Sequence, residues 1–468
     1  MITRIEIDGF KTFEHFSIDF APFVVIAGTN GSGKSNLFDA LMLLSSISDK
    51  DLKEAFAEQR GEPRELFTQY SISSMASQIK LAVELFIDKK VKDDWGNEEE
   101  LSHTRLRYEI HVEKRTDIKS GIEKLFVIHE LLKPIETQKD IWLKRFVNKE
   151  KTIFWKPSNK SHNYKPYIQT GEKNEIPTIS LRQDGSRGGK PTPAKELERS
   201  ILSSVNSTDF PHAYATRKEI SSWRLLHLNP IEMREPSPIL GPDKVNEDGK
   251  YLPSMLRRLE NEEKGILKDI SRSIQNLLPN ISSIRIDEDK SRQQFVLFAK
   301  SPDGREFSSR VLSEGTLRIM LLSALKYDEQ HGGLLCFEEP ENGIHPFRMK
   351  NMLKLLKDLS TDFKEEDDAN RPMRQVIINT HSPLLVKDYF ENEKEFNGLF
   401  YYAQLVTFVH PQNKTAYKIT KLNPVILGND MDMFAATLPP DRSLTNAEII
   451  HYLQTDDAEK GIIEMLKK

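Results

Sequence analysis

The chain has 468 residues, a formal net charge of -4, 29% charged residues and 38% hydrophobic residues. This length allows about two or three structural units with a sizeable core. The balanced charge excludes a polycation that binds nucleic acid over its whole surface. The single cysteine, Cys336, excludes an internal disulfide framework and fits a reducing compartment. No apolar run approaches the roughly 18–20 residues that cross a bilayer, and no signal-peptide pattern opens the chain, so we expect a cytoplasmic protein without a membrane segment.

In chain order, the first informative segment is a glycine-rich loop between a strand and a helix. Residues 2–27 alternate like antiparallel strands and end in an apolar run, and residues 34–47 have a helical pattern. The residues expected to bind nucleotide phosphates are Gly28, Asn30, Gly31, Ser32, Gly33, Lys34, Ser35 and Asn36. Glycines let backbone N–H groups surround a phosphate, and the helix N-terminus adds partial positive charge. Lys34 can reach the β- and γ-phosphates and Ser35 can offer its hydroxyl to Mg²⁺, so the pattern predicts a nucleoside triphosphate site.

The middle of the chain carries weaker signals. Residues 79–87, 105–112 and 125–132 read as β-strands of an antiparallel sheet. Residues 134–195 break this pattern with a composition rich in Pro, Gly and Lys, and we interpret much of this stretch as mobile loop.

Residues 139–167 combine cationic and aromatic side chains. They are Lys139, Lys144, Arg145, Lys149, Lys151, Lys156, Lys160 and Lys165, with Trp142, Phe146, Phe154, Trp155, Tyr164 and Tyr167. Cations for phosphates and aromatics for stacking on bases suit DNA or RNA. An inserted lobe whose aromatics form a small core beneath a solvated basic face explains the same composition, and we favour this second interpretation.

Two apolar strands in the last third of the chain end in polar residues. Residues 333–339 end in Glu338 and Glu339, and residues 374–382 contain His381 after their apolar run. In nucleotide hydrolases a first carboxylate at such a strand end holds Mg²⁺ and a second polarises the attacking water. A histidine at a neighbouring strand end is placed to contact the γ-phosphate. In isolation, the acids would read as a solvated turn and the histidine as structural.

A third segment places small and polar residues before a helix. Ser313, Glu314 and Gly315 precede the amphipathic run 317–322. A Ser and a Gly at a helix N-terminus form an anion site, although alone they would read as a helix cap.

Together, these segments resemble one family in their order and spacing. They are similar to the ABC-type ATPase heads of the SMC/RecF/OLD class, and more closely to bacterial stand-alone RecF-like AAA ATPases. In this resemblance residues 28–35 are the Walker A loop, residues 313–315 the ABC signature, Glu338 and Glu339 the Walker B pair, and His381 the switch histidine. Residues 5–13, 229–252 and 339–346 also resemble segments of the family.

The resemblance implies an α/β fold of the ABC-type ATPase head, with a mixed β-sheet that carries the phosphate loop, an antiparallel β-subdomain and an inserted α/β lobe. It implies ATP and Mg²⁺ as ligands, with Ser35 and Glu338 on the metal. Glu339 and His381 are the implied catalytic residues. Glu338 departs from the Asp that many ABC ATPases carry, and no Q-loop glutamine is marked by its context among Gln59, Gln69 and Gln78.

We expect four segments along the chain. They are 1–133, the N-terminal ATPase half; 134–228, an inserted basic and aromatic lobe with mobile loops; 229–310, a helical segment and a hairpin around Asp303-Gly304; and 311–468, the C-terminal ATPase half.

The resemblance also implies a homodimer or higher oligomer with composite ATP sites, because the signature of one ABC-type subunit closes over ATP held by another. Our leading hypothesis is an ATPase switch whose ATP-dependent dimerisation controls a separately encoded effector, with a role in anti-phage defence. A DNA-repair ATPase that clamps DNA and a non-catalytic scaffold locked by ATP are the alternatives, and an intact Glu339 and His381 argue against the scaffold. No sustained heptads form a long coiled-coil arm, and the segment after His381 is too short for a Toprim nuclease. We interpret Asp430 and Asp432 as a surface turn, because they have no partnering Glu motif upstream and no α/β segment after them.

Overall fold

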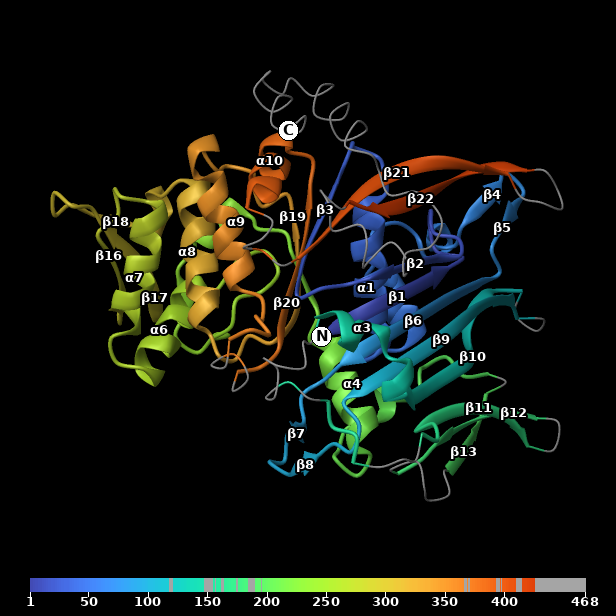
Figure 1. Cartoon of the computed structure of the whole chain (residues 1–468). Coiled ribbons are helices and arrows are strands. Elements are labelled where there is room, and N and C mark those ends of the chain that lie inside the picture. Colours follow the sequence, from blue (N-terminus) through green and yellow to red (C-terminus); the bar gives the residue numbers. More distant parts are fainter. Residues whose placement is uncertain are drawn as a thin grey trace.

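Two large β-sheets and a layer of helices build the described part of the chain (Figure 1). The computed structural model describes residues 1–425 except 118–120, 147–154, 156, 161–163, 174–175, 184–189, 195, 366–367, 369–370, 393–395, 397 and 410–414. Asp430 and Asp432 therefore lie outside the described residues, as do Lys149, Lys151, Phe154 and Lys156 of the basic stretch. None of the helices in the described ranges is long and apolar enough to span a bilayer.

The first sheet is antiparallel and has eight strands in the order β13-β12-β11-β10-β9-β6-β1-β2. Its strands are β1 (Ile2–Asp8), β2 (Phe16–Asp19), β6 (Gln78–Phe86), β9 (Arg105–Thr116), β10 (Glu123–Pro134), β11 (Ile168–Lys173), β12 (Ile176–Leu181) and β13 (Lys190–Pro193). The three predicted strands in the middle of the chain correspond to β6, β9 and β10, and are confirmed.

Strands β11 to β13 lie within residues 134–195, where the sequence predicted much mobile loop and no strand. They extend one edge of the antiparallel sheet, where β11 pairs with β10. The strands are short and contain Pro177, Pro191 and Pro193. Proline within a strand is tolerated mainly near a sheet edge, and for this reason the composition resembled that of a loop.

The second sheet is mixed and carries the phosphate loop. Its order is β14-β19-β20-β3-β21-β22, in which the first five strands run parallel and β22 is antiparallel to β21. The strands are β3 (Phe23–Gly28), β14 (Arg224–Leu226), β19 (Gly333–Glu338), β20 (Arg374–Thr380), β21 (Leu399–Val409) and β22 (Ala416–Pro424). This mixed sheet beside an antiparallel one matches the predicted α/β fold with a mixed β-sheet and an antiparallel β-subdomain, and this part of the prediction is confirmed.

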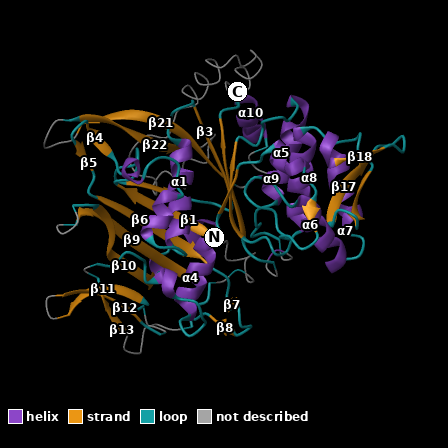
Figure 2. Cartoon of the chain, turned by 180° about the vertical axis from the view of Figure 1, so that it is seen from behind, coloured by secondary structure: helices purple, strands orange, loops and turns teal. Residues whose placement is uncertain are grey.

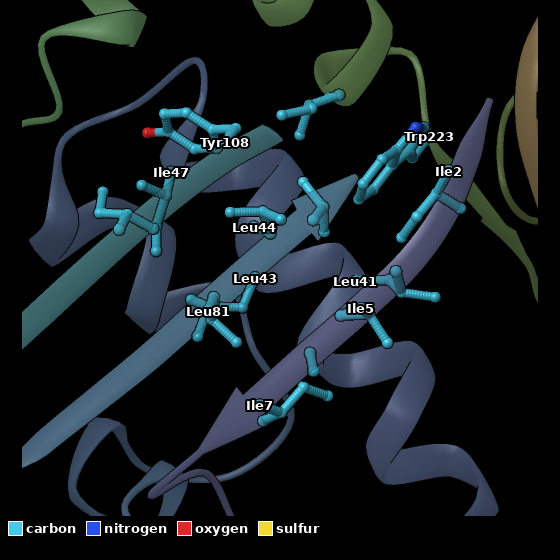
Figure 3. Packing of buried hydrophobic residues seen from close by; sticks show 14 of the residues in the cluster. Ile2, Ile5, Ile7, Leu41, Leu43, Leu44, Ile47, Leu81, Tyr108 and Trp223 are labelled. Atoms are coloured by element: carbon cyan, nitrogen blue, oxygen red, sulfur yellow. The ribbon is translucent and has the colours of Figure 1, made fainter. Parts of the chain in front are cut away.

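Two hydrophobic cores cover the two faces of the mixed sheet. In β3, Val24 and Ile26 belong to the core shared with the antiparallel sheet and α1 (Lys34–Ile47). Val25, between them, belongs to the core shared with the helices within residues 252–277, 314–327, 349–358 and 383–391. Because successive side chains of a strand point to opposite faces, a continuous apolar run is required for a strand buried on both sides. Figure 3 shows the first core, where Ile5 of β1 lies beside Leu41 of α1.

Besides α1, the α-helices of the described residues are α2 (Leu52–Ala57), α3 (Ile141–Phe146), α4 (Pro211–Ser221), α5 (Pro230–Arg234), α6 (Leu252–Glu262), α7 (Ile266–Leu277), α8 (Glu314–Tyr327), α9 (Met349–Asp358) and α10 (Pro383–Glu391). Most of the described helices, α5 to α10, gather on the second face of the mixed sheet (Figure 2). The predicted helical segment 251–279 is two helices, and the break falls at Gly265, whose φ is +98°. A left-handed backbone of this kind interrupts a helix.

The strands of three smaller sheets complete the described part of the fold. They are β4 (Gln69–Ser71), β5 (Ser74–Met75), β7 (Lys90–Lys92), β8 (Glu98–Glu100), β15 (Ser237–Pro238), β16 (Ser283–Asp289), β17 (Gln294–Lys300) and β18 (Glu306–Ser308). The hairpin predicted around Asp303-Gly304 joins β17 to β18, and β16 adds a further antiparallel partner to β17. Within the segment 134–228, the described residues thus contribute β11–β13 to one large sheet and β14 to the other.

Candidate functional site

Three parallel strands bring the predicted nucleotide motifs to one edge of the mixed sheet. Thr380 at the end of β20 pairs with Ala27 of β3, and Asn379 pairs with Glu338 at the end of β19. The carboxyl ends of adjacent parallel strands lie side by side, and ligands of open α/β sheets bind at this edge. The phosphate loop, the acidic pair and the histidine therefore meet, as their positions at strand ends predict.

The phosphate loop runs from the end of β3 into the first turn of α1. Gly33 has a φ of +90° and immediately precedes the helix, whose first turn contains no acidic residue. Lys34 is buried, and its Nζ donates to the carbonyl oxygens of Gly28 at 2.6 Å and Thr29 at 2.9 Å. The Oγ of Ser32 is buried and has no hydrogen-bond partner among the described residues. A positive helix end, a buried ammonium and an unpaired buried hydroxyl fit a phosphate chain.

Side chains from distant parts of the chain brace this loop. The Oγ1 of Thr420 in β22 donates to the carbonyl oxygen of Ser32 at 3.1 Å and lies 2.7 Å from the Oγ1 of Thr12. Asn36 donates from Nδ2 to the same Thr12 hydroxyl at 2.8 Å. A Cβ added to Gly33 would lie 1.9 Å from Thr420 Oγ1. Position 33 therefore requires glycine both for its backbone conformation and for this close approach.

The two acids at the end of β19 have different surroundings. Glu338 accepts from Asn379 Nδ2 at 3.1 Å, and its other oxygen lies 3.3 Å from His227 Nδ1. Glu339 has a φ of +47°, and its Oε1 lies 3.0 Å from Nδ1 of His381. The strained backbone of a non-glycine residue at a strand end is typical of a functional site.

The nearby charges couple the acids to the lysine of the loop. Burial lowers the pKa of Lys34, and the carboxylates of Glu339, Glu341 and Glu338 oppose that shift. Burial raises the pKa of Glu341, whose Oε1 accepts from Thr380 Oγ1 at 2.5 Å. Its Oε2 is buried and has no hydrogen-bond partner among the described residues. The oxygen-rich set fits Mg²⁺, for which Ser35 and Glu338 are the predicted ligands.

The signature residues lie at the start of α8, on the face of the mixed sheet opposite α1. Ser313 is the N-cap of this helix, and its Oγ accepts from the backbone N–H of Thr316 at 3.3 Å. Gly315 lies against the loop after β19, where an added Cβ would be 2.2 Å from the carbonyl oxygen of Gly343. Glu314 forms an ion pair with Arg318 at 2.7 Å. The described contacts of these signature residues are to α8 and to this loop, and none is to the phosphate loop of the same chain.

Sequence reasoning missed several neighbours of the site. They are His227, Glu341, Asn379 and Thr420. Asn379 and Glu341 stand in segments that the motifs already marked, so their positions beside known strand ends could have identified them. Neither His227 nor Thr420 belongs to a motif, and only the tertiary fold brings them to the acids and the loop.

The aromatic residues of the basic stretch are largely buried. Trp142 and Trp155 are each 6% exposed and share a small core with Met1, Phe86 and Phe363. Tyr167, 2% exposed, stacks on His212. Buried rings cannot stack on bases, so among the described residues the arrangement matches the alternative of a small aromatic core rather than a nucleic-acid surface.

Comparison with known proteins places the chain in a family. No curated protein is significantly similar to it. Solved structures that resemble it include an SMC head bound to the C-winged helix domain of ScpA (14% identity, 90% of this chain and 97% of that chain covered, TM-score 0.46). They also include the SMC head domain from Thermotoga maritima (14%, 91% and 99%, TM-score 0.36). A third is the Smc head with an extended coiled coil, bound to the C-terminal domain of ScpA, derived from Pyrococcus furiosus (12%, 90% and 96%, TM-score 0.41).

At these identities and TM-scores, we draw no conclusion about function from the three structures. The family match is broader, because residues 1–386 match the family described as AAA ATPase domain. The match covers the phosphate loop, the strand that ends in Glu338 and the strand that His381 follows. The chain belongs to the AAA ATPase domain family.

Proposed function

We propose that the chain is an ATP-hydrolysing switch, and that Lys34, Glu338, Glu339 and His381 form its catalytic centre. The observation that carries this proposal is the contact between Glu339 and His381, 3.0 Å apart, at the sheet edge that also holds the phosphate loop. A carboxylate paired with an imidazole beside a phosphate site can orient a water molecule and accept its proton.

Each residue has a distinct task in this proposal. The phosphate-loop N–H groups and Lys34 hold the β- and γ-phosphates, and Ser35 with Glu338 holds Mg²⁺. When bound, Mg²⁺ neutralises charge on the phosphate oxygens. Glu339 takes the proton of the attacking water, while His381 fixes the orientation of that carboxylate and stabilises charge on the transferred phosphoryl group.

The proposed switch needs a second copy of the chain. Ser313 and Gly315 begin a helix on the opposite face of the mixed sheet from α1. In the proposed dimer, these residues of one copy cap the γ-phosphate of ATP held by the other copy. ATP then joins the two copies and hydrolysis releases them. We further propose that this cycle controls a separately encoded effector in anti-phage defence, a role that rests on the family resemblance.

ATP hydrolysis and ATP binding by purified protein test the proposed centre. We expect Lys34→Ala to lose ATP binding, because it removes the only lysine of the loop. We expect Glu339→Gln to keep ATP binding and to lose hydrolysis by about 100-fold or more, since a positioned general base contributes about 10²–10⁴-fold. Glu365→Gln, which removes an exposed carboxylate outside the site, is the matched control.

The same assay separates the three roles. Hydrolysis that is unchanged by DNA supports control of a protein effector, whereas a strong increase with DNA supports the DNA-clamping alternative. A Glu339→Gln protein that hydrolyses ATP like wild type contradicts the catalytic assignment and favours a scaffold.

A further inference from the structure

A second cluster of ligand-type side chains lies on the antiparallel sheet, away from the nucleotide motifs. Glu109 and His111 stand two residues apart on β9, so they point to the same face. Tyr108 and Ile110 point to the other face and are buried in the core with α1. His129 of β10 pairs directly with His111. Two imidazoles and a carboxylate from adjacent strands therefore share the outer face of the sheet.

The distances within this cluster match the spacing of ligands around one metal ion. Glu109 Oε1 lies 3.2 Å from His111 Nε2 and 3.5 Å from His129 Nε2. The three ligand atoms all lie within 4.8 Å of one another. Zinc binds nitrogen and oxygen ligands at about 2.0–2.1 Å in a tetrahedron, which separates neighbouring ligand atoms by about 3.3–3.4 Å. The two carboxylate–imidazole distances bracket that value.

A β-bulge creates this arrangement. Val127 pairs with Val112, but His129 rather than Ile128 pairs with His111, so the register shifts between these two pairs. In a regular ladder an isoleucine would face His111. Bulges re-aim side chains and are frequent beside functional sites.

The surroundings orient the carboxylate and leave access to solvent. Arg107 Nη2 donates to Glu109 Oε2 at 3.3 Å, so the other oxygen of Glu109 faces the two imidazoles. Hydrogen bonds of this outer kind hold metal-binding carboxylates in place. Glu109 and His111 also line a surface hollow of about 420 Å³, together with Lys80 and His15.

We propose that Glu109, His111 and His129 bind one divalent transition-metal ion of the zinc class, with a fourth position open to this hollow. Imidazole ligands favour Zn²⁺, Cu²⁺, Ni²⁺ or Fe²⁺ over Mg²⁺, so the site is chemically distinct from the Mg²⁺ position in the nucleotide centre. Three protein ligands with one open position is the composition of zinc sites that bind a water molecule or another small ligand.

Zinc binding by untagged full-length protein, without nucleotide, tests the proposal. Equilibrium dialysis with Zn²⁺ gives the stoichiometry and affinity, and the visible absorption of bound Co²⁺ reports imidazole coordination in a tetrahedral site. We expect one ion per chain. We expect His111→Ala and His129→Ala each to weaken binding by about 100-fold or more, because loss of even an outer partner costs about 10–100-fold.

Three variants keep the test decisive. His15→Ala removes a histidine of the same hollow that stands instead near Asp8 and Glu14, and it should bind zinc like wild type. Glu338→Gln should also bind like wild type, since it alters only the nucleotide centre. Glu109→Gln preserves side-chain shape and serves where a histidine variant fails to fold. Wild-type protein without stoichiometric zinc, unchanged binding by His129→Ala, or loss of binding by His15→Ala would each overturn the proposal.

Discussion

Gly33 carries two separate constraints in a single residue. Its φ of +90° lies in the left-handed region, and Thr420 Oγ1 lies where a Cβ would be placed. Gly31 has a similar φ of +77° but no atom within 4 Å of an added Cβ. A substitution at Gly31 would therefore meet backbone strain alone, whereas one at Gly33 would meet both backbone strain and steric overlap.

We expect Gly33→Ala to destabilise the protein more than Gly31→Ala. The left-handed conformation costs each alanine about 1–2 kcal/mol, and the overlap with Thr420 adds about 1–3 kcal/mol at position 33 alone. Urea unfolding without nucleotide measures both variants against wild type. Equal losses of unfolding free energy would show that Thr420 moves aside freely and that the close approach is not a constraint.

At the scale of elements, a buried carboxylate fastens a turn to the antiparallel sheet. Glu130 of β10 is fully buried and accepts from the backbone N–H groups of Ile201 at 2.7 Å and Leu202 at 2.9 Å. It also accepts from the hydroxyl of Tyr108 at 3.0 Å. Three donors converge on one side chain, so its removal leaves several buried polar groups unpaired.

We expect Glu130→Ala to lower the free energy of unfolding by about 3–5 kcal/mol, because three buried donors lose their acceptor and each buried donor left unpaired costs about 1–3 kcal/mol. Tyr108→Phe removes one of the three donors and should cost only about 1 kcal/mol. Chemical denaturation of both variants provides the comparison. If Glu130→Ala cost no more than Tyr108→Phe, the turn at Ile201 would not depend on this carboxylate.

The elements also differ in how far sequence alone could predict them. The strand that ends at Gly28 and the helix from Lys34 have long apolar or amphipathic runs, and both were predicted at their observed positions. Short strands such as β11 and β14 lie at or near sheet edges and bury fewer side chains, so their hydrophobic pattern is weak. The nucleotide motifs were predictable because each is local in sequence. The contacts of His227 and Thr420 could not be predicted, since each depends on strands from distant parts of the chain.

For the whole molecule, the mixed sheet separates the helix of the phosphate loop from the helix of the predicted signature. Helix α1, which follows the phosphate loop, packs on one face with the antiparallel sheet, while α8, which follows Ser313, packs on the other (Figure 1). This separation supports the proposal that the signature acts on ATP held by a second copy. If the site is composite, mixing two inactive variants can rebuild an intact site, whereas a site within a single chain cannot be rebuilt in this way.

We expect two inactive variants to restore hydrolysis when they are mixed. Lys34→Ala lacks ATP binding but keeps its signature, whereas Ser313→Asp keeps the phosphate loop but places a negative charge against the γ-phosphate of the other copy. Asp is as good an N-cap as Ser, so α8 should remain intact, and Ser313→Thr is the matched control that should stay active. A mixed dimer contains one intact site, formed by the phosphate loop of the Ser313→Asp copy and the signature of the Lys34→Ala copy. If the copies pair at random, half of the dimers are mixed, and each mixed dimer has one intact site out of two. Up to about one quarter of wild-type hydrolysis should therefore return if each site works independently. ATP turnover of each variant alone and of the mixture measures this. A mixture no more active than its components would contradict the composite site, and the signature residues would then act only within their own chain.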